Sequence, residues 1–195
     1  MLRKIFVSLS VLMCVSSTVF AAPKTNASAP DFTLSDQNGD QISLHNFSGK
    51  IVVLEWFNPE CPFVKRHYES GTMKNLVKKY QEQGVVWLGI NSTHFHDVAT
   101  NRAFAEKYDI PYPMLSDQSG ATGKAYGAKT TPYMVVIDSK GNLAYHGAID
   151  SDKWGEASSA TNYVDLALSE LTQGKKVSKV ETNSYGCSVK YAAAG

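Results

Sequence analysis

The fold is decided by the stretch IVVLEWFNPECPF, residues 51–63. Its first seven residues are rich in β-branched and aromatic side chains, which is typical of a buried central strand. Pro62 suits the first turn of a helix, and apolar residues then recur at helical spacing as far as Tyr80. Gly71 is expected to weaken or bend that helix. The stretch therefore predicts a strand, a short turn and a helix, with Cys61 at the turn.

This position predicts a reactive thiol at Cys61. Unpaired backbone N–H groups and the positive end of the helix dipole converge at a helix start and favour a thiolate there. Lys65 and Arg66 lie about one turn further on and would add to this field, whereas Glu60 would oppose it. A more acidic thiol is a better nucleophile near neutral pH. The alternative is a structural cysteine packed under the helix.

Outward from this stretch, strands and helices alternate. Asn38-Gly39 favours a tight turn between two short strands and predicts a small hairpin. The other expected elements are strands at 85–90 and 112–115, helices at 97–108, 120–127 and 162–173, and a hairpin formed by 131–138 and 141–149. This order indicates an α/β fold with a mixed central sheet flanked by helices.

The chain of 195 residues, 43% of them hydrophobic, has enough apolar material for one buried core. We expect a signal peptide at 1–21, a flexible lead-in at 22–30, one domain at 31–176 and an irregular tail at 177–195.

The first residues have the layout of a secretory leader. Arg3 and Lys4 precede an apolar run, and Val19 and Ala21 occupy the two positions that signal peptidase reads. The run is short for a retained membrane anchor. Met13 is not the small residue that a lipoprotein signal has before its cysteine, here Cys14. We therefore expect a periplasmic or otherwise exported protein without stable membrane insertion.

Cleavage changes the net charge from +1 to −1, because the leader carries two positive charges and no acidic residue. Nothing in this balance indicates a nucleic-acid partner. Cleavage also leaves Cys61 and Cys187 as the only thiols, and an oxidising compartment allows them to pair. Cys187 could resolve an oxidised Cys61, form a permanent disulfide or remain a free thiol, and the spacing alone leaves all three open.

Several motifs carry a resemblance to a known family. The segments APDFTLSDQNG and FSGKIVVLEWFNPECP resemble the opening of the redoxin group, which unites peroxiredoxins (the AhpC/TSA relatives) and thioredoxin-like thiol reductases. YPMLSD and TPYMVVIDSKG continue the likeness. Within the group, the chain is most similar to peroxiredoxin-like proteins with Asn-x-x-Cys-Pro, here Asn58 to Pro62, and Gly-Cys-Ser-x-Lys, here Gly186 to Lys190.

The resemblance implies a thioredoxin fold with an N-terminal hairpin extension, and no cofactor. It also implies that Thr131-Pro132 is a cis-proline loop facing Cys61, where the Thr131 backbone docks an extended substrate segment; the alternative is an ordinary proline before an edge strand. The implied activity is that of a thiol oxidoreductase acting on a disulfide or a peroxide. Its partners would be that substrate, which includes thiol or disulfide proteins, and an unknown thiol reductant.

The sequence departs from the family at defined positions. Val64 stands where thioredoxins have their second cysteine. Leu54 and Asn58 stand where peroxiredoxins proper have a proline and a threonine or serine, and the peroxide-activating arginine has no match near 134–138. These departures leave Cys61 without a nearby partner cysteine and put peroxidase activity in question.

Histidines suggest two further hypotheses. His67 follows the nucleophile on the predicted helix and could carry a proton or simply be exposed. Cys61, His94 and His96 could form a copper site, because copper chaperones share the fold, although Lys65 occupies the position of their second cysteine. A metal carrier, or a binding module without turnover, is therefore the alternative to an oxidoreductase.

Overall fold

The computed structural model describes residues 24–193. The predicted leader at 1–21, with its alternative role for Cys14, lies outside the described residues. Within 24–193, no helix combines the length and the apolar character needed to cross a bilayer.

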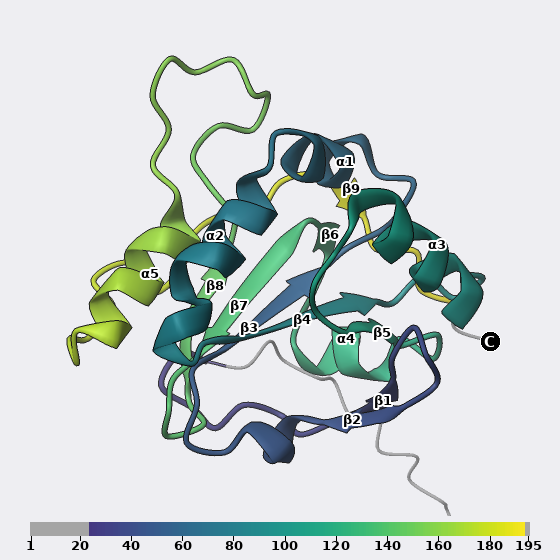
Figure 1. The fold of residues 1–195 in the computed structure, drawn as a ribbon, viewed down its shortest axis with the longest axis horizontal. Helices are drawn as coiled ribbons and strands as arrows, with labels where there is room; N and C mark the ends of the chain where they lie inside the picture. The colour runs from purple at the N-terminus through teal and green to yellow at the C-terminus, as the bar shows by residue number, and fades with distance from the viewer. Residues whose placement is uncertain (1–23, 194–195) are drawn as a thin grey trace, which may run out of the picture.

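A seven-stranded mixed sheet forms the centre of the molecule (Figure 1). Its spatial order is β2-β1-β5-β4-β3-β7-β8, in which β3 pairs in parallel with β4 and antiparallel with β7. The strands are β1 (Thr33–Ser35), β2 (Gln41–Ser43), β3 (Val52–Trp56), β4 (Val86–Asn91), β5 (Met114–Ser116), β7 (Tyr133–Ile137) and β8 (Leu143–Gly147). This arrangement is the expected thioredoxin fold, and β1 and β2 form the expected N-terminal hairpin.

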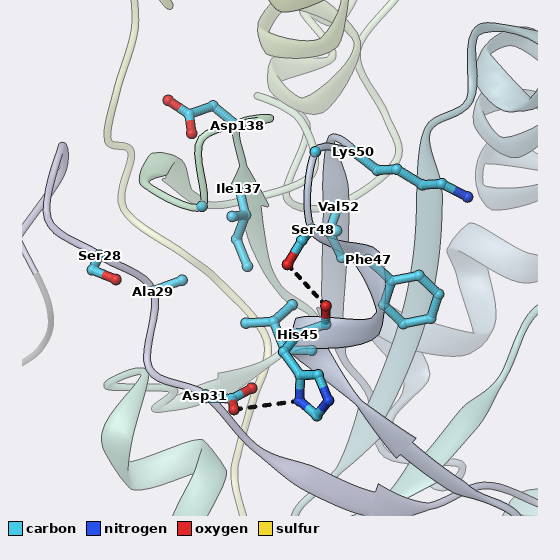
Figure 2. Close-up of a pocket in the computed structure, with 13 residues that line it drawn as sticks. Ser28, Ala29, Asp31, His45, Phe47, Ser48, Lys50, Val52, Ile137 and Asp138 are labelled. Carbon is cyan, nitrogen blue, oxygen red and sulfur yellow. Dashed lines mark hydrogen bonds and ion pairs between the residues drawn. The ribbon is translucent and has the colours of Figure 1, made fainter.

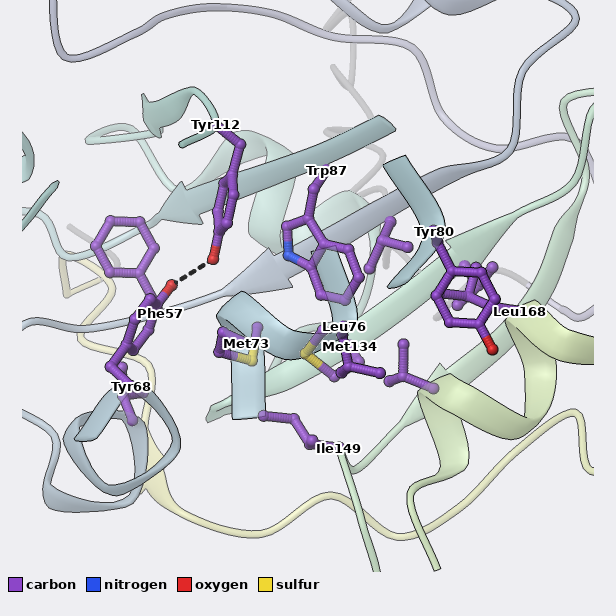
Figure 3. Packing of buried hydrophobic residues seen from close by; sticks show 14 of the residues in the cluster. Phe57, Tyr68, Met73, Leu76, Tyr80, Trp87, Tyr112, Met134, Ile149 and Leu168 are labelled. Carbon is purple, nitrogen blue, oxygen red and sulfur yellow. Dashed lines mark hydrogen bonds between the residues drawn. The ribbon is translucent and has the colours of Figure 1, made fainter. Parts of the chain in front are cut away.

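Helices cover both faces of the sheet. The first face carries α1 (Pro62–Glu69), α2 (Thr72–Tyr80), α3 (Val98–Tyr108) and α5 (Tyr163–Thr172), whose apolar side chains share one core cluster. The second face carries α4 (Ala121–Ala125). Two short 3-10 helices complete the set, η1 (Leu44–Phe47) and η2 (Gln81–Gln83). Figure 3 shows the first cluster, in which Trp87 and Met134 on the sheet meet helix residues such as Leu76 and Leu168.

Gly71 interrupts the helix that follows Cys61. Its φ of 74° lies in the left-handed region, which glycine adopts without steric cost. The predicted weakening is thus a complete break, and α1 and α2 are separate helices. Both helices pack into the same core cluster, α1 through Val64 and Tyr68 and α2 through Met73.

The lead-in needs a correction. The segment at 22–30 is predicted to be flexible, but Asn26 and Ala29 within it are hydrogen-bonded to the β7–β8 hairpin, with Asn26 N donating to Leu143 O at 2.8 Å and Ala29 N to Gly141 O at 2.9 Å. Unpaired backbone groups of the hairpin find partners here, which the polar composition of the segment did not indicate.

The tail also needs a correction. It was expected to be irregular, yet it contains β9 (Cys187–Ser188), which pairs antiparallel with β6 (Thr130–Thr131). Figure 1 shows the yellow tail passing behind α1 to reach β6. A two-residue strand has no periodicity to read in a sequence, so only its partner identifies it.

Candidate active site

Cys61 lies at the start of α1, as predicted. It is the residue that caps the helix, with extended backbone angles, and Pro62 is the first helical residue. Asn58 shapes the preceding turn, because its carbonyl accepts from Cys61 N at 3.0 Å and its side chain accepts from Glu60 N at 2.8 Å. Asn58 and Pro62 therefore hold the backbone that places the thiol.

The Cys61 thiol is buried, with only 2% of the residue exposed. Its Sγ donates to the carbonyl oxygen of Thr131 at 3.0 Å. The Thr131-Pro132 peptide bond is cis, as the resemblance implied. The cis-proline loop therefore faces the thiol through its backbone carbonyl, and this contact is available only to the protonated sulfur, since a thiolate has no proton to donate.

The surroundings of Cys61 nevertheless lower the pKa of its thiol. Burial raises this pKa, but the thiolate form is stabilised by hydrogen bonding to the side chain of Cys187, the backbone N–H of Val64 and the side chain of Thr131, and this outweighs burial. The Thr131 hydroxyl is buried and makes no hydrogen bond to the neutral thiol among the described residues. It is therefore a free donor that a thiolate would recruit.

Cys187 lies close to Cys61 in space, although the two are far apart in the sequence. In the β6–β9 pair it lies directly opposite Thr131, and its partly buried side chain packs against the core cluster that contains Cys61. Cys61 and Cys187 are not joined by a disulfide in this structure. Burial and the interaction with Cys61 raise the pKa of Cys187 to about 11. The pair thus combines a more acidic buried thiol with a less acidic, more accessible one.

Arg66 has hydrogen-bond partners other than Cys61. The Arg66 guanidinium donates to the carbonyl of Asp152 at 2.8 Å and to the Tyr185 hydroxyl at 3.3 Å, and so contacts the loop after β8 and the tail. The Lys65 backbone N–H donates to Cys61 O at 3.0 Å in the first turn of α1.

A polar cluster of Arg66, His67, Asp150, Asp152 and Tyr185 joins α1 to the tail. The Tyr185 hydroxyl donates to Asp150 Oδ1 at 2.6 Å and lies 3.0 Å from His67 Nε2. His67 is buried at 2% exposure, so it is no exposed helix residue. Burial lowers the pKa of His67 to about 4 despite the nearby Asp150, which keeps the imidazole neutral at pH 7.

The copper alternative gains no support from the geometry. His94 is exposed, whereas His96 is buried and points to Glu60, 3.9 Å away, and to Asn91. Within residues 24–193, no three or more His, Cys, Asp or Glu side chains are grouped as metal ligands would be. The set of Cys61, His94 and His96 is therefore not assembled.

Sequence reasoning missed Glu55, a fully buried carboxyl in the middle of β3. Tyr68 and Tyr112 donate to its Oε2 at 2.7 and 3.0 Å, and Figure 3 shows these two hydroxyls pointing at one another. Burial raises the pKa of Glu55 to about 7 although both hydrogen bonds oppose the rise. An acidic residue in an otherwise apolar strand was the available signal.

A surface hollow lies at the opposite end of the sheet from Cys61. Figure 2 shows it between the lead-in, η1 and the β7–β8 turn, lined by residues that include Asp31, His45 and Lys50. It is bounded by Val52, which begins β3, whereas Cys61 follows the end of that strand. It contributes nothing to the thiol site.

With this geometry in hand, comparisons with known proteins place the chain. The model of the AhpC/TSA family matches residues 25–146, well over half of the sequence. The chain belongs to the AhpC/TSA family. The match includes Cys61 and the Thr131-Pro132 loop but ends before the tail that carries Cys187. The tail of this AhpC/TSA family member is thus an addition to the matched region.

Relatives come from both branches of the redoxin group. The chain is 34% identical over 125 residues to chloroplastic peroxiredoxin Q from Triticum aestivum, covering 60% of this chain and 55% of the relative. It is 31% identical over 115 residues to the thiol-disulfide oxidoreductase ResA of Bacillus thuringiensis, covering 59% of this chain and 64% of that one. The matched segment thus spans little more than half the length of the wheat protein.

Among solved structures, a hypothetical protein from Sinorhizobium meliloti 1021 superposes with a TM-score of 0.81 at 28% identity, covering 89% of this chain and 98% of that one. This similarity extends over more of the chain than the family match does, and so it includes elements beyond residue 146.

Proposed function

We propose that this AhpC/TSA family member is an exported thiol oxidoreductase in which Cys61 is the nucleophile and Cys187 the resolving thiol. The observation that carries the proposal is the position of Cys187 opposite Thr131, whose carbonyl contacts the Cys61 thiol. Relatives named peroxiredoxin Q and thiol-disulfide oxidoreductase support the class of chemistry. The leader-like segment at 1–21 supports export.

The reaction on a peroxide has two steps. The Cys61 thiol releases its proton to solvent, and the thiolate attacks one peroxide oxygen. The O–O bond breaks, the leaving alkoxide or hydroxide takes up a proton from solvent and departs as alcohol or water, and Cys61 becomes a sulfenic acid. Cys187 then attacks the Cys61 sulfur, releasing water and forming the Cys61–Cys187 disulfide. On a disulfide substrate, Cys61 forms a mixed disulfide first, and Cys187 displaces the second substrate thiol. An external thiol reductant then returns both cysteines to the reduced state.

Unequal thiol pKa values support this division of roles. The first attack needs a thiolate, and hydrogen bonds lower the pKa of Cys61. Cys187, with its pKa raised to about 11, remains a thiol until Cys61 has been oxidised. Thr131 would then stabilise the Cys61 thiolate through its hydroxyl, and Pro132 would fix the loop that presents it.

The test compares wild type with Cys61→Ser and Cys187→Ser after addition of hydrogen peroxide or of a small disulfide. We expect wild type to form the intramolecular disulfide and to consume substrate with a thiol reductant. Cys61→Ser should lose all turnover, and Cys187→Ser should stop at a sulfenic acid or mixed disulfide detectable by mass spectrometry. Full activity in Cys61→Ser would refute the proposal, and an inert wild type would favour a binding module instead.

A further inference from the structure

The tail segment, defined as residues 180–191, is hydrogen-bonded to β8 and to the strand before the cis-proline, β6. His146 N donates to Val180 O at 3.0 Å, and Thr182 N donates back to His146 O at 3.1 Å. Further along, Val189 N donates to Lys129 O at 3.0 Å. The tail segment therefore crosses from the edge of β8 to beyond β6 as bound backbone.

Glycines in the body of the fold make room for the tail segment. A Cβ at Gly147 would overlap Thr182, and a Cβ at Gly120 would overlap the ring of Tyr191. In the tail segment itself, Gly186 has a φ of 123° and packs on the Thr131 carbonyl, where a Cβ would overlap the oxygen. These approaches are so close that only glycine allows them, which indicates that the tail segment packs tightly and specifically against the body of the fold.

Side chains fasten the middle of the tail segment beside Cys61. Tyr185 binds Asp150 and His67 in the polar cluster, and Ser184 Oγ lies 2.8 Å from Thr130 Oγ1. Burial and the interaction with Asp150 raise the pKa of the Tyr185 hydroxyl, which keeps it protonated as the donor of this bond. The segment is thus held on both sides of Cys187.

The tail segment occupies the strand edge at Thr131 that a polypeptide substrate would need. An extended substrate segment would dock by pairing with the free edge of Thr131, as strand addition requires. That edge is already paired with β9, and Cys61 is only 2% exposed. The expectation that Thr131 docks a substrate strand is therefore corrected: its backbone docks Cys187 of the same chain.

We propose that the tail segment restricts Cys61 to low-molecular-weight oxidants, hydroperoxides or small disulfides, and excludes disulfides within folded proteins. This inference rests on the proposed function of Cys61 and Cys187. A hydroperoxide needs little more room than a water molecule and no strand edge, so it can react while β9 stays paired. A protein disulfide requires the tail segment to leave, and Tyr185 opposes that departure.

The experiment measures two second-order rates on the reduced full chain, one with hydroxyethyl disulfide and one with the disulfides of insulin. For wild type we expect the insulin rate to be at least about 100-fold lower, as for a site that must open before binding. Tyr185→Phe removes the hydroxyl that binds Asp150 and His67. It should raise the insulin rate about tenfold, the effect of losing a hydrogen bond to a charged group, and leave the small-disulfide rate within about twofold.

Two further variants keep the test decisive. Thr182→Val removes the hydroxyl that binds Ala148 N at 2.9 Å, in the part of the tail segment that pairs with β8, and should act in the same direction as Tyr185→Phe. Asn183→Ala changes an exposed residue of the same segment and should match wild type on both substrates. Equal wild-type rates on insulin and on the small disulfide, or equal gains on both substrates in the variants, would overturn the size limit.

A second readout does not depend on turnover. Cys61 alkylation is followed by mass spectrometry with iodoacetamide and with a maleimide on a long polyethylene glycol chain. We expect wild type to react with the small reagent only and Tyr185→Phe to admit both. If neither substrate were turned over, the proposed function would fail, while this labelling pattern would still decide whether the tail segment excludes large partners. Equal labelling of wild-type Cys61 by both reagents would contradict the inference.

Discussion

Gly186 packs against the backbone carbonyl of Thr131, and no side chain fits between them. The contact aligns β9 with β6 and so sets the position of Cys187 opposite Thr131. The same carbonyl oxygen accepts a hydrogen bond from the Cys61 thiol, so this one atom contacts both the tail and the nucleophile.

Gly186→Ala should therefore separate the two cysteines. The added methyl group must push β9 away from Thr131, and we expect the peroxide-driven formation of the Cys61–Cys187 disulfide to slow at least about tenfold. Gly174→Ala is the matched control, because Gly174 also has a positive φ, 71°, but a Cβ there meets nothing within 4 Å. Disulfide formation followed by mass shows the difference, and equal rates in the two variants would rule out this role for Gly186.

The acidity of Cys61 should depend on Cys187. Cys187→Ala removes a hydrogen-bond donor to the Cys61 sulfur and should raise the pKa of Cys61. Cys187→Ser keeps a hydroxyl donor and should restore part of the effect. The ultraviolet absorbance of the thiolate against pH measures both variants, and an unchanged Cys61 pKa in Cys187→Ala would show that Val64 and Thr131 suffice.

The reductant should attack the disulfide at Cys187. Cys187 is the more accessible sulfur, and Cys61 is the better leaving group because its thiol pKa is the lower of the two. Oxidised protein that is treated briefly with a mass-tagged thiol, with the reaction then stopped by acid, should carry the tag on Cys187. A tag found on Cys61 instead would reverse the assignment of the leaving group.

Glu55 should make stability depend on pH. Its folded-state pKa is about 7, above the ordinary value of 4.5 for a glutamate, so its contribution to folding is fully present below pH 4.5 and is lost as pH rises through 7. The loss amounts to about 3 kcal/mol, at about 1.4 kcal/mol per pKa unit. Glu55→Gln should remove this pH dependence. Between pH 5 and pH 8, the free energy of unfolding should fall in wild type and stay nearly constant in the variant.

Urea unfolding at pH 5 and pH 8 measures the effect. Glu82→Gln alters an exposed carboxyl on η2 and serves as the control, which should follow wild type at both values. If Glu55→Gln followed wild type as well, the carboxyl would not be the group that titrates.

The sequence predicted the elements whose signals are local. The apolar run before Asn58 and the proline after Cys61 were sufficient for β3, α1 and the thiol between them. Asn38-Gly39 likewise predicted the β1–β2 hairpin. These features depend on residues near in sequence, so periodicity and turn chemistry reveal them.

The parts that were missed depend on partners distant in sequence. β9 exists because Thr131 lies opposite it, and Arg66 turns to the tail because Tyr185 and Asp152 are there. His67 is buried for the same reason. Local sequence patterns carry no information on such tertiary contacts, which form only when segments distant in sequence come together during folding.

The β6–β9 pairing also orders events during folding. Cys61 lies in the first third of the chain and its cover in the last tenth, so the sheet, α1 and the nucleophile can form before the segment that shields them has been made. Until then, the strand edge at Thr131 and the Cys61 thiol are open to any neighbouring chain. Truncation before Gly186 would make that vulnerable stage permanent and would leave Cys61 without Cys187, so C-terminal nonsense variants should accumulate as dimers or mixed disulfides linked through Cys61 rather than as inactive monomers.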